Sequence, residues 1–244
     1  MSKMVVSLDD LESSHILDNP IYHSLVSIHS SFNLGNENVA FFPPEIMPMV
    51  GAPRWDSDVQ PTILSSLPKG VDSFIVLHRE RISIEPSLAE TLFEGIGVQM
   101  VCFDVAPFDF SGFSIQALDS THVPAMLALT KLTQPGPFVK NTINFGSFVG
   151  ILKDGDLVAM GGERLQLPCV NNKFSEVTSI CVHPEYQRKG YGRAIITHIC
   201  NRIKQRGDIP FLHCRQSKTG AIGMYEKVGF RKRCDVHVAN FRIK

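Results

Sequence analysis

The second half of the chain shows two hydrophobic periods in succession, one typical of strands and one typical of helices. Apolar runs at 145–152 and 157–164 flank an Asp-Gly turn at 153–156, a combination that predicts a β-hairpin. Residues 174–182 alternate with a period of two, which predicts a further strand. Residues 193–204 repeat apolar side chains at helical spacing and therefore predict an amphipathic helix.

The alternation over 174–182 assigns its side chains to two faces. One face would carry Glu176, Thr178, Ile180 and Val182, and the other Val177, Ser179 and Cys181. Four more elements complete this half: a helix at 119–132, a strand at 209–214, a helix at 219–228 and one or two strands within 230–243. The predicted order is helix, hairpin, strand–loop–helix, strand, helix, strand.

The first half gives a weaker α/β pattern. Asn19 and Pro20 resemble a helix start, with Asn19 as the cap, and apolar residues follow at Ile21, Leu25 and Ile28. Further along, the pattern predicts an irregular proline-rich stretch at 41–53, a helix at 60–67, a strand at 72–78, a helix at 87–94 and a strand at 97–104.

Residues 106–112 are the best candidate linker, and the charge changes sign there. Residues 1–112 carry 5 Lys and Arg against 15 Asp and Glu, whereas residues 113–244 carry 19 against 9, so net charges of −10 and +10 cancel. We therefore predict an N-terminal α/β domain at 1–112 and a second domain at 113–244. The alternation in the first half also permits a degenerate copy of the second domain's fold.

Composition excludes several protein classes. The 43% apolar content predicts a packed core, and a net charge of zero excludes a polycation that coats nucleic acid. We find no stretch of 18 apolar residues and no signal-peptide pattern in residues 1–15, so we expect no membrane span and a cytoplasmic location. The six cysteines are widely spaced and predict reduced, mostly buried thiols, and no metal-ligand spacing is present.

The segment 187–192, Gln-Arg-Lys-Gly-Tyr-Gly, lies between the strand at 174–182 and the helix at 193–204. Gly190 and Gly192 allow close approach to a ligand, and amides at a helix N-terminus attract anions. Arg188 and Lys189 add positive charge suited to phosphate oxygens. An ordinary strand-to-helix turn would also fit this spacing taken alone. The segment matches neither the Walker loop nor the G-x-G-x-x-G pattern.

In its context, this segment resembles motif A of the GNAT acyl-CoA N-acyltransferases. The strand before it ends in Val182-His183-Pro184-Glu185, and residues 220–230 resemble that family's A-x-x-x-Y-E-K-x-G-F segment. The resemblance covers about 113–244, because three segments agree in order. It implies a C-terminal GNAT fold, with a mixed, mostly antiparallel sheet flanked by helices. Residues 18–25 resemble, less specifically, the N-terminal extension of one subgroup.

The resemblance also implies how acetyl-CoA would bind. The motif A strand would splay from the next strand at a bulge and leave a gap for the pantetheine arm. Backbone groups of Ile180, Cys181 and Val182 would contact that arm. Gln187 opens the motif, and the pyrophosphate would lie on the amides of Arg188, Lys189, Gly190, Tyr191, Gly192 and Arg193.

Two residues are the predicted catalytic groups. Tyr225 matches the family position that protonates the departing thiolate, and packing beside the cofactor is its other interpretation. Glu176 is the candidate base for the amine, directly or through water, and a structural ion pair is its other interpretation. Glu163 and His213 are weaker candidates, Glu163 as a pocket residue and His213 more as a hydrogen-bonded core residue. Cys181 and Cys214 are expected to be core thiols.

Lys218 departs from the family pattern, which usually has Asn there. Lys218 cannot accept a hydrogen bond, so it would either approach the phosphates or weaken the site, and Ser217 or Thr219 would take over the helix cap. The leading hypothesis is therefore an N-acetyltransferase acting on a primary amine, and the alternative is a catalytically weakened CoA-binding or regulatory module. Nucleic acid is not an expected partner. The acceptor and the oligomeric state stay open, with 43–53 a candidate wall of the acceptor pocket.

Overall fold

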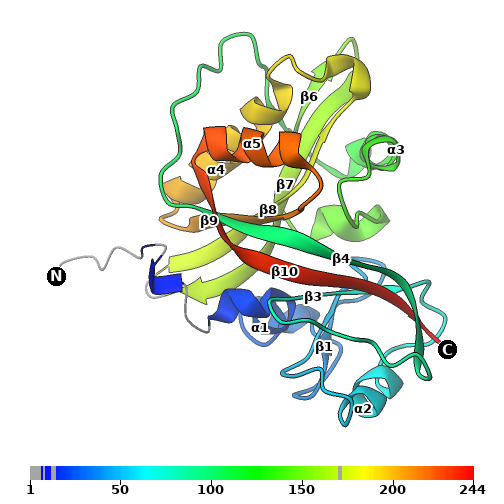
Figure 1. Ribbon diagram of the computed structural model, residues 1–244. Coiled ribbons are helices and arrows are strands. Elements are labelled where there is room, and N and C mark those ends of the chain that lie inside the picture. Colours follow the sequence, from blue (N-terminus) through cyan, green and yellow to red (C-terminus); the bar gives the residue numbers. More distant parts are fainter. Residues whose placement is uncertain (1–6, 8, 12–14, 170–171) are drawn as a thin grey trace.

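The computed structural model describes residues 7, 9–11, 15–169 and 172–244, so the extreme N-terminus lies mostly outside the described residues. Its centre is an eight-stranded sheet (Figure 1). In spatial order the strands are β3 (Phe74–His78), β10 (Phe230–Ile243), β4 (Ala89–Cys102), β9 (Ile209–Arg215), β8 (Asn172–Val182), β7 (Asp156–Cys169), β6 (Phe148–Lys153) and β5 (Gln116–Leu118). Neighbouring strands pair antiparallel except β8 and β9, which pair parallel. The predicted mixed, mostly antiparallel sheet is confirmed.

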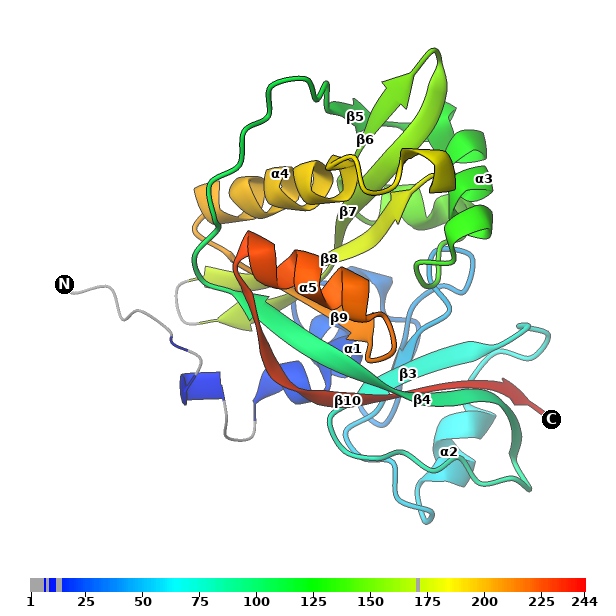
Figure 2. The same cartoon turned by 45° about the horizontal axis from the view of Figure 1, so that its top comes forward.

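Helices cover both faces of this sheet (Figure 2). On one face, α4 (Tyr191–Gln205) and α5 (Thr219–Val228) pack on the central strands. On the other face lie α1 (Pro20–Leu25), near β3 and β7, and α3 (Val123–Thr133), near β7 and β8. The remaining elements are α2 (Gln60–Ser65), a small sheet of β1 (Ala40–Phe41) and β2 (Val50–Gly51), and 3-10 turns at Asp9–Leu11, Ile16–Asp18, Ser30–Phe32, Ser120–His122, Lys140–Asn144 and Pro184–Tyr186.

The elements predicted for the second half are confirmed. The hairpin turn has left-handed backbone at Asp154 (φ 53°) and Gly155 (φ 92°), as a tight two-residue turn requires. Helix α5 has the predicted bounds and ends at Gly229, whose φ of 115° suits glycine alone. Residues 230–243 form one strand rather than two.

One prediction for the first half is wrong, and a second holds only in part. Residues 87–94 are not a helix, because from Ala89 they form the start of β4, which pairs with β10 along its whole length. This tertiary pairing outweighs the local preference of a short Glu- and Leu-containing segment. Helix α1 begins at Pro20 with Asn19 at the N-cap position, as predicted, but the Asn19 side chain makes no capping hydrogen bond. Its Nδ2 donates to the carbonyl of Ala52 at 2.7 Å, and α1 ends at Leu25, before Ile28.

Strands from both sides of residue 112 share the main sheet. The C-terminal strand β10 lies between β3 and β4, which come from the first half of the chain (Figure 1). The segment predicted as a linker, 106–112, is coil in the structure. Whether 1–112 and 113–244 form separate domains, and whether the first is a degenerate copy of the second, stay predictions of the sequence.

The two halves of the chain bury a common core. One cluster combines Leu17 and Ile21 near α1 with Phe174, Phe211 and Val236 on the sheet, all of them buried. The fold therefore fixes the first half against the strands that carry the candidate site. In the described part of the chain, no helix is long and apolar enough to cross a membrane.

Candidate functional site

Strands β8 and β9 pair for only a short distance and then separate. Their parallel register runs from Phe174 with Ile209 to Glu176 with Phe211, and no later pair follows among the described residues. On its other side β8 carries a bulge, because the register with β7 skips between Gly162–Thr178 and Met160–Cys181. Within the bulge Ser179 has a φ of 54°. The predicted bulge and splay are therefore present, at the expected strand.

The loop after β8 is shaped as an anion cradle. Arg188 and Gly190 both have left-handed backbone, with φ of 60° and 87°, and helix α4 begins at Tyr191. The first intrahelical amide bond of α4 runs from Ala194 to the carbonyl of Gly190. The amides of Tyr191, Gly192 and Arg193 precede it and are the donors that a helix start leaves without intrahelical partners. These amides are therefore candidate donors for a phosphate group.

The charged side chains of this loop take different directions. Lys189 lies over the ring of Tyr186, with 5.2 Å from Nζ to the ring centroid. Arg193 turns back, stacks on Phe108 and donates from Nη2 to the carbonyl of Lys227 at 3.3 Å. The Arg193 side chain is therefore engaged within the protein, and its backbone amide is the candidate donor. Gln187 also bonds within the protein, from Nε2 to the carbonyl of Val182.

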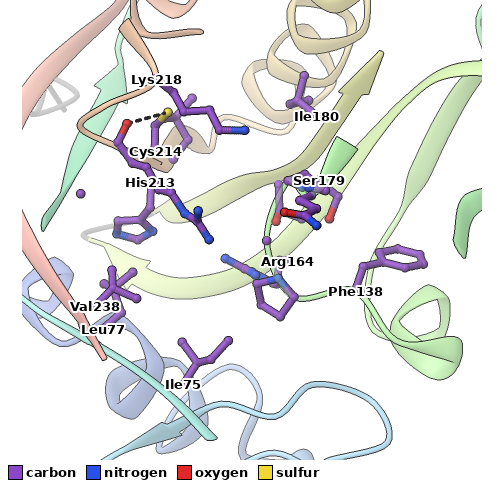
Figure 3. A pocket seen from close by; sticks show the side chains of 18 of the residues that line it. Ile75, Leu77, Phe138, Arg164, Ser179, Ile180, His213, Cys214, Lys218 and Val238 are labelled. Atoms are coloured by element: carbon purple, nitrogen blue, oxygen red, sulfur yellow. Dashed lines mark hydrogen bonds between the residues drawn. The ribbon is translucent and has the colours of Figure 1, made fainter. Parts of the chain in front are cut away.

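The splay opens into a cavity of about 810 Å³. Figure 3 shows Ile180, Cys214 and Lys218 at the end nearest the splay, and Ile75, Leu77 and Val238 at the opposite end. We call these the cofactor end and the acceptor end. The acceptor end is formed by β3, β4, β10 and Met49, so one residue of the predicted 43–53 wall does line it. Met49 also bridges to Ile75 of β3 as an isolated parallel pair.

Glu176 lies between the two ends and is almost completely buried. Its carboxylate accepts two hydrogen bonds from Arg164, at 2.7 Å from Nε and 2.8 Å from Nη2, and a third from His213 Nδ1 at 2.8 Å. Burial raises the pKa of Glu176, but the charge and hydrogen bonds of Arg164, together with His213, outweigh burial and lower it. The carboxylate is therefore held ionised and engaged with its partners.

The proton position on His213 follows from its neighbour Gln99. Gln99 Oε1 accepts from Arg233 and its Nε2 donates to the carbonyl of Leu17, so the orientation of this amide is fixed. Its Nε2 lies 2.8 Å from His213 Nε2, which must therefore be the acceptor. The imidazole then carries its proton on Nδ1 and donates it to Glu176. Both ring nitrogens are occupied within the protein, in agreement with the core-histidine interpretation.

Tyr225 lines the cofactor end and is mostly buried. Burial raises the pKa of Tyr225, and the nearby thiols of Cys214 and Cys181 act in the same direction. The phenol is therefore protonated throughout the neutral range. No hydrogen-bond partner for its hydroxyl is present among the described residues, so the O–H is available to a ligand in the cavity.

Lys218 lines the cofactor end as well, at the N-cap position of α5. No side chain caps this helix, so the cap predicted for Ser217 or Thr219 is absent. Figure 3 shows the Lys218 side chain extending over the cavity. The lysine thus brings a positive charge to the cavity where the family pattern has an amide.

Two other candidates lie elsewhere. Glu163 binds Arg206 at the end of α4, on the face of β7 opposite to Arg164, and is not part of the cavity lining. The Cys181 side chain packs against α3 and does not line the cavity, and burial raises the pKa of its thiol to about 11. A covalent acyl-cysteine role is therefore disfavoured. The described residues contain no cluster of His, Cys, Asp and Glu suited to a metal ion.

The sequence analysis did not single out Arg164, Gln99 or Arg233. A signal for Arg164 was present, because it is a cation inside the apolar strand that ends the hairpin, two positions after Gly162. No sequence pattern indicated Gln99, because its partners come from β9, β10 and the turn before α1. Such long-range pairings do not leave a spacing in the sequence.

The FR47-like protein family matches residues 148–239. The [ribosomal protein bS18]-alanine N-acetyltransferase of Escherichia coli strain K12 is 29% identical over 122 residues, which cover 49% of this chain and 81% of that relative. The strands and helices of the candidate site lie largely within the matched family region.

Two solved structures extend the likeness to the first half. A GNAT-family protein from Novosphingobium aromaticivorans DSM 12444 superposes with a TM-score of 0.84 at 30% identity, over 95% of this chain and 100% of that one. A GCN5-related N-acetyltransferase from Kribbella flavida, at 12% identity and a TM-score of 0.60, covers 90% and 95% of the two chains and shows the shared fold alone. The protein is an acetyltransferase that belongs to the GNAT superfamily.

Proposed function

We propose that this protein transfers an acetyl group from acetyl-CoA to a primary amine by direct attack. The observation that carries the proposal is the separation of β8 from β9 after Glu176, which opens the cavity directly beside the anion-binding loop. A thioester arm lying in that gap would reach Tyr225 from the cofactor end. An amine would enter from the acceptor end.

The proposed cofactor contacts follow from backbone geometry. The amides of Arg188 to Arg193 would hold the pyrophosphate at the start of α4. Backbone groups of Ile180, Cys181 and Val182 would pair with the pantetheine arm, because β9 no longer pairs with this part of β8. Lys218 would add a cation at the cofactor end.

In the proposed step, the amine nitrogen bonds to the thioester carbonyl carbon and the carbon–sulfur bond breaks. Tyr225 gives its proton to the departing thiolate, and the ammonium formed by the attack loses a proton to water. The buried phenol is protonated at neutral pH, as an acid must be before it acts. Solvent then returns the proton to Tyr225.

The role of Glu176 differs from that of a free base. Its carboxylate is held by Arg164 and His213, and a carboxylate whose pKa is lowered accepts a proton from an ammonium group only weakly. We therefore favour Glu176 as a positioning residue that fixes Arg164 and His213 beside the acceptor. The amine then reacts in its neutral form.

This assignment predicts a pH profile set by the acceptor. With acetyl-CoA saturating, log kcat/KM for the amine should rise by about one per pH unit until the acceptor's own pKa, which is near 8 for an α-amine. For two amines of different pKa, the profiles of log kcat/KM should level off at two different pH values. A plateau from about pH 5 upward, the same for both amines, would show instead that an ionised Glu176 is the base.

The loop provides a separate test of cofactor binding. Gly190→Ala places a Cβ where φ is 87° and where Phe113 Cζ would lie at 3.0 Å, so the cradle must distort. Left-handed alanine costs about 1–2 kcal/mol, and we expect the Kd of acetyl-CoA to rise about tenfold. Gly220→Ala is the control, since no atom lies within 4 Å of its added Cβ. Equal Kd values for the two variants would show that the loop does not bind acetyl-CoA.

The proposed function as a whole is tested by acetyl-CoA-dependent thiol release with a panel of primary amines. Release with at least one amine, together with its N-acetylated product, is the expected result. Thermal stabilisation by CoA without thiol release from any amine would favour the CoA-binding module instead. Absence of thermal stabilisation by CoA or acetyl-CoA would contradict both acetyl transfer and the CoA-binding module.

A further inference from the structure

The acceptor end of the cavity is mostly apolar. Its side chains come from strands far apart in the sequence and from the proline-rich segment, and they are Met49, Ile75, Leu77, Phe93, Val236 and Val238. Phe93 is partly exposed although it is large and apolar. A hydrophobic group entering this end would cover surface that the folded chain leaves in contact with water.

The charged groups of the cavity are nearly all of one sign. Four cations line it, namely Lys131, Arg164, Arg215 and Lys218, against Glu176 as the one carboxylate among the described lining residues. Glu176 is already compensated by its bidentate pair with Arg164. The other three cations form no ion pair within the described part of the chain. The cavity therefore carries an uncompensated positive charge.

The acidic first half of the chain does not make the cavity acidic. The residues that it contributes to the cavity are Met49, Ile75, Leu77, Gly97 and others without a carboxylate. Its acids lie on other surfaces, as with Asp58, which pairs with Arg54. A polyamine would meet like charges here, whereas an anionic group would meet favourable ones.

Arg215 is the cation best placed to receive an anionic group at the acceptor end. It ends β9 on the same face as His213, two residues before it, and its partner in β4 is Gly97, which has no side chain. Its guanidinium lies 5.1 Å from the ring centroid of Phe93. This stacking orients the guanidinium plane and leaves its N–H donors for a planar anion such as a carboxylate.

We propose that the acceptor is an apolar α-amino acid, or a short peptide ending in one, whose carboxylate binds Arg215. This assignment rests on the proposed function and names its substrate class. The apolar side chain packs on the acceptor end, and the amine points toward the splay between β8 and β9. Lys131, at the end of α3, adds positive charge at the rim of the cavity.

The first experiment compares three acceptors that differ only at the carboxylate: leucine, leucinamide and isopentylamine. Thiol release with acetyl-CoA is measured for each, and kcat/KM is expressed per neutral amine because their pKa values differ. We expect leucine to exceed leucinamide and isopentylamine by about tenfold or more, since a charge-assisted hydrogen bond has that strength.

Arg215→Gln tests the assigned residue. This variant should reduce the preference for leucine over leucinamide to near one, with little change for isopentylamine. Arg231→Gln is the matched control, because Arg231 is an exposed cation of β10 that does not line the cavity. A preference that survives Arg215→Gln, or leucinamide equal to leucine in the unaltered protein, would overturn the proposal while leaving acetyl transfer intact.

Binding of the products separates this proposal from the proposed function. In the presence of CoA, N-acetylleucine should raise Tm more than N-acetylleucinamide, and Arg215→Gln should abolish the difference. If no amine gives thiol release but this difference is seen, the proposed function fails and the carboxylate site stands. Equal shifts from the two products would reject the carboxylate site.

Discussion

Glu176→Gln is expected to lower the free energy of unfolding by about 3–5 kcal/mol. The side chains of Arg164 and Glu176 are 8% and 1% exposed, so the variant leaves a guanidinium buried without a counterion. The amide also presents N–H groups where Arg164 needs an acceptor, because only one of its two polar atoms is an oxygen. Denaturant titration of both proteins at neutral pH measures the difference.

The stability lost in Glu176→Gln should come from the unpaired charge of Arg164 and not from a change in side-chain shape. The double variant Arg164→Met with Glu176→Gln removes both charges and keeps an oxygen for His213 Nδ1. It should recover much of the stability lost in the single variant, because a buried pair replaced as a whole costs little. Asp58→Asn, which breaks the exposed pair with Arg54, should change stability by less than about 1 kcal/mol.

The same ion pair predicts how stability depends on pH. The folded-state pKa of Glu176 is lowered relative to an unfolded carboxyl near about 4.3. Its contribution is therefore fully present above that value and is lost as pH falls through it toward the folded-state pKa. Between about pH 5 and pH 3 the unaltered protein should lose stability more steeply than Glu176→Gln. Parallel curves would mean that Glu176 is not held ionised by its partners.

The sequence was sufficient where local pattern and chain order coincide. The hairpin, the loop at 187–192 and helix α5 each combine a hydrophobic period with a turn residue, and all were predicted near their true positions. Gly229 ends α5 because its backbone is left-handed, which the sequence indicates directly. These elements hold most of the predicted cofactor contacts.

The sequence was insufficient where distant segments determine the structure. Residues 87–94 have a locally ambiguous pattern, and it is pairing with β10 that makes them a strand. The same pairing brings Phe93 to the cavity, beside β3 and Met49. A spacing argument over one window cannot predict this wall, because its parts are separated by well over 100 residues along the chain.

The environment of Glu176 illustrates the same limit for chemistry. Its position on the motif A strand was predicted, and two interpretations, a base and an ion pair, were left open. The deciding partners are Arg164 on β7 and His213 on β9, and Gln99 on β4 then sets the imidazole proton. A residue type and a strand position therefore identify a candidate, but only the neighbours determine how it can react.

Tyr225→Phe is expected to reduce kcat by about 10²-fold or more, while the Kd of acetyl-CoA changes little. The variant removes the one proton that the proposed step delivers to the departing thiolate. It should not unfold the protein, because the hydroxyl has no hydrogen-bond partner among the described residues and the ring keeps its packing beside Phe230. Single-turnover thiol release separates this chemical step from binding.

Two measurements, one on the unaltered protein and one on the variant, distinguish an acid from a packing residue at position 225. Because burial raises the pKa of Tyr225, the unaltered protein should keep its kcat without an alkaline decline up to at least about pH 10. The slow variant should regain rate with a thioester whose thiol is more acidic, since such a thiolate leaves without a proton. Tyr22→Phe is the control, because it removes a hydroxyl that is bonded to the carbonyl of Glu37 and Tyr22 does not line the cavity. If Tyr225→Phe is equally slow with both thioesters, or is as fast as Tyr22→Phe, then Tyr225 does not protonate the leaving group.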